Sequence, residues 1–121
     1  MTYCNCGHSP ALLLRRGESK FEPLGNMGPP LAISARAKYA ARSITLAPGD
    51  MLFLYSDGVT EAENPRSELF GAERLEQALA EARGRGARET VEHVVQRVTE
   101  FAAGAPQSDD ITCVAVVRGE T

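Results

Sequence analysis

The chain has 121 residues, of which 43% are hydrophobic and 24% are charged, a length and balance typical of one globular domain. Its 13 Lys and Arg against 16 Asp and Glu give a formal net charge of −3, so no basic excess points to a nucleic acid or an anionic membrane surface as partner. The sequence also lacks an apolar run long enough to span a membrane and the pattern of a signal peptide. We therefore expect a cytoplasmic protein.

The first part of the chain predicts short strands separated by turns. Alternating residues predict a strand over residues 3–8, a second over 11–15 and a weaker third over 21–24,. Pro23 lacks an amide hydrogen, which restricts this strand to the edge of a sheet or places the proline at a strand end. Residues 25–30 are rich in Gly and Pro and predict an ordered loop,, at a position where a segment that gates substrate would be expected.

The middle of the chain predicts two further strands. Residues 41–46 alternate and end in a turn at 47–50, and residues 51–55 form a continuous apolar run,. Such a run is typical of a central strand that is covered on both faces. The chain then leaves the sheet at Asp57 and Gly58.

The second half predicts two helices and a last strand. Apolar residues recur at helical spacing over residues 72–83, and again from Arg88 to the Gly-Ala-Pro segment at 104–106,. Residues 109–117 are rich in β-branched residues and predict the closing strand, followed by a polar tail,. The predicted fold class is α+β, a mostly antiparallel sheet with two helices packed on one face. The other face would then expose apolar side chains.

The three cysteines give no sign of a disulfide framework or of a cysteine-rich metal site. Cys4 and Cys6 lie two residues apart in a predicted strand, so their side chains share a face and would not readily bridge,. Cys113 lies in the last predicted strand. We expect all three to act as buried or half-buried small hydrophobic residues.

Aspartates stand at the ends of two strand-like runs. Asp57 follows residues 51–55, and Asp109 and Asp110 precede the run at 111–117. Carboxylates that converge at a sheet edge bind hard cations such as Mg²⁺ or Mn²⁺. Taken singly, Asp57 is as consistent with a turn, and the Asp109–Asp110 pair with the protection of a strand end.

Five segments, in this order, resemble one protein family: CNCGHSPALL at 4–13, LAPGD at 46–50, YSDGVTEAEN at 55–64, FGAERL at 70–75 and SDDIT at 108–112. The chain resembles the metal-dependent serine/threonine protein phosphatases of the PPM type, in the bacterial branch of stage II sporulation E and the stress regulators that control sigma factors. The resemblance implies a binuclear Mn²⁺ or Mg²⁺ centre at the edge of an α-β-β-α sandwich. A water bound there would attack a phosphoserine or phosphothreonine of a regulatory protein, such as an anti-sigma-factor antagonist.

Carried over by motif, the resemblance makes Asp57 and Asp109 metal ligands. Asp110 would stand beside the metal without binding it, and Gly58 would permit the tight turn after Asp57. His8 and Glu61 are weaker candidates, for which a hydrogen-bonded turn and a solvated loop are the ordinary explanations.

The family also carries an earlier Gly-Asp segment, whose aspartate bridges both metals. Residues 1–50 contain nothing equivalent, so residues 1–121 resemble the C-terminal portion of the domain. Two carboxylates would hold a divalent cation weakly. The alternative is therefore a catalytically inactive fragment that acts as a protein-interaction module, and we expect a homodimer through the exposed sheet face.

Overall fold

The computed structural model describes residues 1–25, 28–107 and 109–119. Part of the loop at 25–30 and of the polar tail thus lies outside the described residues. No helix in the described ranges is long and apolar enough to cross a membrane. In chain order the elements are β1 (Thr2–Tyr3), β2 (Ala11–Leu14), β3 (Phe21–Leu24), β4 (Arg42–Ser43), β5 (Met51–Tyr55), α1 (Asp57–Thr60), α2 (Gly71–Glu81), α3 (Ala87–Ala102) and β6 (Cys113–Val117).

The main sheet has the strand order β3-β2-β5-β6, and all of its neighbouring strands are antiparallel. This arrangement confirms the predicted α+β class with a mostly antiparallel sheet. Pro23 pairs with Leu12 in β3, at the edge of the sheet as predicted. The central strand β5 joins β2 on one side to β6 on the other, with Tyr55 opposite Cys113 at its end. A separate ribbon consists of β1 and β4.

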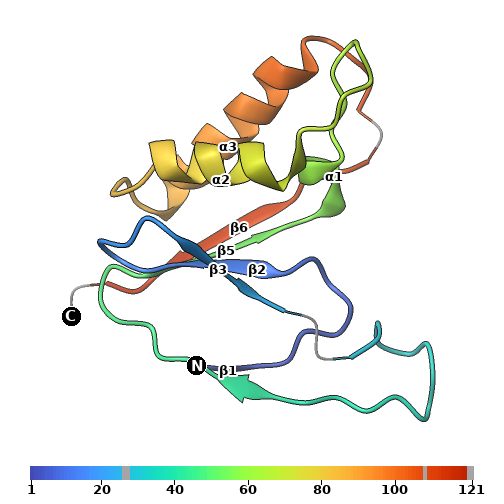
Figure 1. The fold of residues 1–121 in the computed structure, drawn as a ribbon, viewed down its shortest axis with the longest axis vertical. Helices are drawn as coiled ribbons and strands as arrows, with labels where there is room; N and C mark the ends of the chain where they lie inside the picture. The colour runs from blue at the N-terminus through green and yellow to red at the C-terminus, as the bar shows by residue number, and fades with distance from the viewer. Residues whose placement is uncertain (26–27, 108, 120–121) are drawn as a thin grey trace.

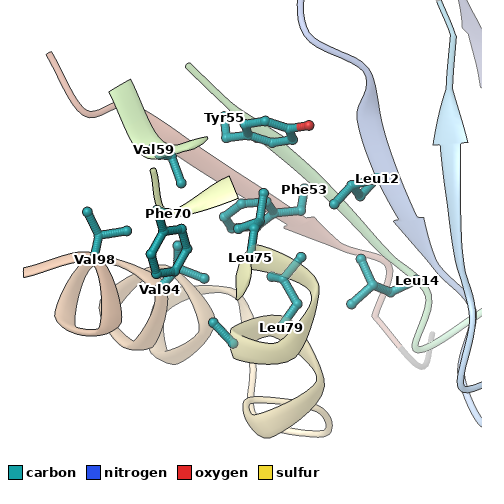
Figure 2. Packing of buried hydrophobic residues seen from close by; sticks show 11 residues of the cluster. Leu12, Leu14, Phe53, Tyr55, Val59, Phe70, Leu75, Leu79, Val94 and Val98 are labelled. Carbon is teal, nitrogen blue, oxygen red and sulfur yellow. The ribbon is translucent and has the colours of Figure 1, made fainter. Parts of the chain in front are cut away.

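Both helices α2 and α3 cover one face of the main sheet (Figure 1). Their apolar stripes meet the alternate residues of β2 and β5 that point towards them, and Phe70 packs edge-on against Phe101. Each fully buried Leu or Phe contributes roughly 1.5–3 kcal/mol to the stability of the fold. Figure 2 shows this main cluster, whose buried members are Leu12, Leu14, Phe53, Tyr55, Val59, Phe70, Leu75, Ala78, Leu79, Val94 and Val98.

The opposite face of the sheet is covered only in part. Leu13, Leu24 and Leu52 form a second buried cluster under residues of the β1–β4 ribbon and its flanks, including Tyr3 and Ile44. β5 is therefore covered on both faces, as its continuous apolar run predicts. By contrast, Val114 and Val116 of β6 are each 47% exposed. The predicted apolar exposure is confirmed at β6 and is wrong beneath the ribbon.

Several predicted strands are shorter in the structure. The strand expected over residues 3–8 ends at Tyr3, because only Thr2 and Tyr3 find partners, in β4; the chain then turns at Gly7, where φ is +80°. Of residues 41–46, only Arg42 and Ser43 pair, with β1. The closing strand begins at Cys113 rather than at 109, because residues 109–112 make specific contacts with the end of β5 instead of a regular ladder.

The helices agree with the prediction to within a few residues. The stripe of Leu75, Ala78, Leu79 and Ala82 is buried as expected. Val95 belongs to the apolar residues that recur at helical spacing after Arg88, and we expected it to face the sheet, but it is 38% exposed. Val94 already faces the sheet, and an adjacent residue lies about 100° further around a helix. A short helix that the sequence did not predict, α1, begins directly at Asp57.

Candidate functional site

The candidate site lies where β5 ends and α1 begins. Asp57 is the first residue of α1, and its exposed carboxylate accepts a hydrogen bond of 2.7 Å at Oδ1 from Ser9 Oγ. Ser9 follows the turn at Gly7 and immediately precedes the segment that enters β2, which is the neighbour of β5 in the sheet. The antiparallel pairing of β2 and β5 therefore brings together two residues that are 48 positions apart in the sequence.

Ser56 attaches the segment before β6 to the end of β5. Its backbone N–H donates to the carbonyl of Thr112 at 2.9 Å, and its hydroxyl donates to the carbonyl of Asp110 at 2.9 Å. The same hydroxyl accepts the N–H of Thr112 at 3.0 Å. Three hydrogen bonds from one residue thus extend the contact between the strands beyond the last regular pair, and they hold the two aspartate segments side by side.

Gly58 makes this approach possible. A Cβ atom at this position would lie 2.1 Å from the carbonyl oxygen of Asp110 and 3.2 Å from that of Asp109. The first distance is well inside van der Waals contact, and both obstructing atoms belong to the backbone. The glycine predicted from the tight turn is thus required here by the close packing of two backbone segments.

Asp109 and Asp110 are both exposed beside this contact. The Oδ1 atom of Asp109 accepts the N–H of Asp110 at 2.7 Å, and its carbonyl accepts Gln107 Nε2 at 2.7 Å. These bonds fix the local backbone and leave the carboxylates at the surface. The structure therefore places the Asp57 segment beside the Asp109–Asp110 segment, and a role as metal ligands stays a prediction for these residues.

The site carries a negative electrostatic field. The pKa of Tyr55, the last residue of β5, is raised by burial and by the negative charges of Asp57 and Glu76. The charge of Asp57 therefore acts on the adjoining core as well as on solvent. A negative field with exposed carboxylate oxygens suits a hard divalent cation.

The fit to a metal is nevertheless partial. No group of three or more His, Cys, Asp or Glu side chains within the described ranges is arranged to hold a metal ion. The Asp57 and Asp109 segments have the donor chemistry for Mn²⁺ or Mg²⁺, but they do not amount to a complete ligand set. A cation at this edge would need further oxygen ligands.

The two weaker candidates have local hydrogen bonds. His8 is exposed; its Nδ1 lies 2.8 Å from the carbonyl of Ser9, and its N–H donates to Asn5 Oδ1 at 2.8 Å. Glu61 is exposed at the C-terminus of α1, where its N–H donates to the carbonyl of Asp57. These contacts agree with the turn and loop explanations, and a role at the metal stays a prediction for both residues.

Sequence reasoning missed the two serines of the site. The position of Ser56, between a buried strand and an aspartate, is a signal that could have identified it, because a short hydroxyl there can reach a neighbouring strand. No local pattern identifies Ser9, since its partner Asp57 is remote in sequence.

The fourth aspartate of the sequence, Asp50, lies outside the site at the other end of β5. It is 2% exposed, and its carboxylate accepts hydrogen bonds from the N–H groups of Arg16 and Ala47 at 2.8 and 2.9 Å and from the Arg15 guanidinium at 3.0 Å. Burial opposes ionisation of this carboxyl. The two backbone bonds and Arg15 outweigh that effect and hold the pKa of Asp50 below its ordinary value.

Known proteins share this fold and sequence pattern. The chain is 34% identical over 118 residues to Protein IcfG of Synechocystis sp. (strain ATCC 27184 / PCC 6803 / Kazusa), covering 98% of this chain and 18% of that protein. It is 28% identical over 117 residues to the phosphoserine phosphatase RsbU of Bacillus subtilis (strain 168), covering 97% of this chain and 34% of RsbU. The chain thus spans about a third or less of these curated relatives.

The solved SiaA-PP2C domain of Pseudomonas aeruginosa superposes with a TM-score of 0.72 at 25% identity, over 93% of this chain and 44% of that one. The family model described as stage II sporulation protein E (SpoIIE) matches residues 1–119. Sequence and fold therefore lead to the same conclusion: the chain belongs to the SpoIIE family of PP2C-type phosphatase domains.

Proposed function

We propose that the chain is part of a metal-dependent protein serine/threonine phosphatase domain that acts on a phosphorylated regulatory protein, such as an anti-sigma-factor antagonist. The observation that carries the proposal is the convergence of the Asp57 and Asp109 segments at one edge of a sheet whose fold matches a solved PP2C domain. The similarity to a phosphoserine phosphatase, RsbU, supports the choice of substrate class. A cytoplasmic location is part of this proposal.

Each residue of the site has a role in the proposal. Asp57 and Asp109 bind Mn²⁺ or Mg²⁺, and Ser9 orients the Asp57 carboxylate through its hydrogen bond. Ser56 and Gly58 hold the two segments together, and Asp110 adds negative charge beside them. When bound, the metal lowers the pKa of a coordinated water and offsets the charge of the phosphoryl oxygens.

In this proposal the chain supplies only part of the ligand set of the metal centre. Two carboxylates bind a divalent cation weakly because affinity depends strongly on the number of anionic ligands. The remaining ligands would come from residues outside this chain, in keeping with the chain covering 44% of the SiaA-PP2C domain. Residues 1–121 would accordingly be the C-terminal portion of the phosphatase domain.

Calorimetric titration of Mn²⁺ into the purified chain tests the site. We expect weak binding that Asp57→Asn reduces by about tenfold or more, since one of two anionic ligands is lost. Glu89→Gln is the matched control, because it removes one exposed negative charge in the first turn of α3, from a residue that has no part in the proposed site. Equal weakening by both variants would show only a loss of general negative charge and would contradict the assignment.

Turnover of a phosphoserine peptide, measured on the same samples, separates the two functional readings. Turnover that is lost in Asp57→Asn supports the enzyme. Binding of Mn²⁺ without turnover favours the alternative, a phosphatase-like module that acts through protein interaction.

The exposed face of β6 is the observation that favours this alternative. Val114 and Val116 are each 47% exposed beside the partly covered cluster of Leu52 and Leu54, and adjacent apolar side chains on a sheet favour association. We propose that two copies pair through this face. Sedimentation analysis should show a dimer that Val116→Lys weakens, while the control Val95→Lys, on the outer side of α3, leaves it unchanged. A monomer at high concentration would contradict the proposal.

A further inference from the structure

The thiols of Cys4 and Cys6 lie in contact. Their Sγ atoms are 3.7 Å apart, which is about the sum of two sulfur radii. Both residues follow β1 instead of lying in it, so the strand geometry that would have kept the side chains parallel and apart does not apply. Cys4 is exposed and Cys6 is half-buried, so the pair can be reached from solvent.

The pair borders a small cavity of about 200 Å³ that reaches to the candidate site. Cys4 and Cys6 form part of its wall, and so do His8 and Ser9. A small oxidant could therefore approach the sulfur atoms through a cavity whose wall includes Ser9, the residue that donates a hydrogen bond to Asp57.

We propose that Cys4 and Cys6 form a redox modification site, at which a hydroperoxide generates an intrachain disulfide that alters the contact between Ser9 and Asp57. This inference concerns covalent chemistry of the chain itself and is therefore independent of the phosphatase proposal.

The reaction is balanced by the two thiols and one hydroperoxide. The sulfur of Cys4, the exposed member, attacks the peroxide O–O bond, giving a sulfenic acid and releasing an alcohol, or water when the oxidant is hydrogen peroxide. The sulfur of Cys6 then attacks the sulfenic sulfur, forming the S–S bond and releasing water. The thiols lose two electrons and the peroxide gains them, and a dithiol reductant reverses the change.

The order of attack follows from the surroundings of the two thiols. Cys4 is exposed whereas Cys6 is half-buried, and the pKa of Cys6 is raised by desolvation and by its contacts with Cys4, so Cys6 is the poorer first nucleophile and is left to attack the sulfenic acid formed at Cys4. Cys113 offers an internal comparison. Burial raises its pKa to about 11, which keeps this third thiol protonated and slow to oxidise.

The disulfide would act on the site through Asn5, which lies between the two cysteines. Asn5 Oδ1 accepts the N–H of His8 at 2.8 Å, and Asn5 Nδ2 donates to the carbonyl of Leu24 at 3.4 Å. To form a bond of about 2.05 Å, the sulfur atoms must approach further, which turns the intervening backbone. That movement shifts Asn5 and the His8 amide, and with them Ser9, the next residue.

The turn after the pair limits how the strain can dissipate. Gly7 has a φ of +80°, and a Cβ atom there would lie 2.6 Å from the ring of Pro30. Pro30 thus blocks the space beside Gly7. The ring that a disulfide between Cys4 and Cys6 would close is small and therefore strained. Strained disulfides are readily reduced, as a reversible site requires.

Mass spectrometry after graded hydrogen peroxide and alkylation with iodoacetamide tests the chemistry. We expect a loss of about 2 Da and of alkylation at both Cys4 and Cys6, restored by dithiothreitol, while Cys113 stays alkylatable only after unfolding. Cys4→Ser and Cys6→Ser should each abolish the disulfide, and Cys113→Ala should leave it intact. Oxidation to sulfinic acid, or disulfides between chains, in the unaltered protein would overturn the proposal.

Amide NMR spectra of the reduced and oxidised protein test the coupling. We expect the signals of Ser9 and Asp57 to shift on oxidation, and to remain in place when Cys6→Ser is treated in the same way. A disulfide that forms while both signals remain unmoved would overturn the link to the site. Neither measurement requires phosphatase activity.

Discussion

The two ends of β5 place aspartates in opposite environments. Asp50, just before the strand, is 2% exposed and accepts three hydrogen bonds, one of them from the Arg15 guanidinium. Asp57, just after the strand, is exposed and accepts one hydroxyl hydrogen bond, from Ser9. A carboxylate whose lone pairs are taken by the protein stabilises the fold, whereas an exposed one with remaining lone pairs can bind a ligand. The same residue type thus supports the fold at one end of the strand and, in the proposed function, binds a metal at the other.

Of the variants considered, Asp50→Asn should cause the largest loss of stability. In Asp50→Asn an NH₂ group replaces one carboxylate oxygen and would face a hydrogen-bond donor. Arg15 would also lose its anionic partner. We expect a loss of about 3 kcal/mol in the free energy of unfolding, as for a broken, mostly buried ion pair. Chemical denaturation measures it, with Asp57→Asn as the control that should change stability by less than about 0.5 kcal/mol. Equal losses in the two variants would remove the distinction.

The pH dependence of stability tests the same difference between Asp50 and Asp57. The folded-state pKa of Asp50 lies below its ordinary value of 3.8, so its contribution to stability is present above that value and is lost as the pH falls through the folded pKa. Unfolding measured between pH 7 and pH 2 should therefore show the stabilities of the unaltered protein and Asp50→Asn converging at low pH. A constant difference would mean that ionisation of Asp50 is not what stabilises the fold.

Gly58→Ala tests whether the Asp57 end of β5 depends on close backbone packing. The added Cβ would lie 2.1 Å from the carbonyl oxygen of Asp110, so the two aspartate segments must separate. We expect a loss of about 1–3 kcal/mol, as for overpacking elsewhere in proteins, together with weaker Mn²⁺ binding. Gly25→Ala, where a Cβ atom meets open space, is the control. Unchanged stability and cation affinity in Gly58→Ala would contradict the role given to this contact.

Removing the Ser9 hydroxyl should have the smallest effect. The Ser9–Asp57 bond is exposed, so Ser9→Ala should cost no more than about 1 kcal/mol of stability. Its main expected effect is a modest fall in Mn²⁺ affinity, because Asp57 loses the contact that orients it. Thermal unfolding and calorimetry on Ser9→Ala measure both quantities. A large loss of stability would show that Ser9 supports the fold rather than the site.

The sequence predicted those features that depend on local periodicity. The apolar run of β5 and the stripes of α2 and α3 can be recognised in the sequence, because regular burial imposes a regular spacing of apolar residues. The length of short elements such as β4 was overestimated, because two residues in a ribbon owe their conformation to distant partners. For the site, the two aspartate segments were predicted to converge, and they do. The bond between Ser9 and Asp57 is a tertiary contact that no local pattern encodes.

The hydrogen bonds of the Asp50 side chain could not be predicted, for a similar reason. The Pro-Gly-Asp sequence predicts a turn, which the hydrogen bond from the Asp50 N–H to the carbonyl of Ala47 confirms. The sequence does not show that β2 ends beside this turn and supplies Arg15. Whether a turn aspartate becomes a buried anchor depends on which strand pairs with its neighbour.

The edge position of β3 has a consequence for solubility. An outermost strand normally offers a row of free amide and carbonyl groups to which a strand from another molecule can add. Pro23 has no amide hydrogen to donate, and the charged, exposed Glu22 beside it disfavours pairing with a strand from another molecule. One short strand thereby closes that side of the sheet to edge-on aggregation.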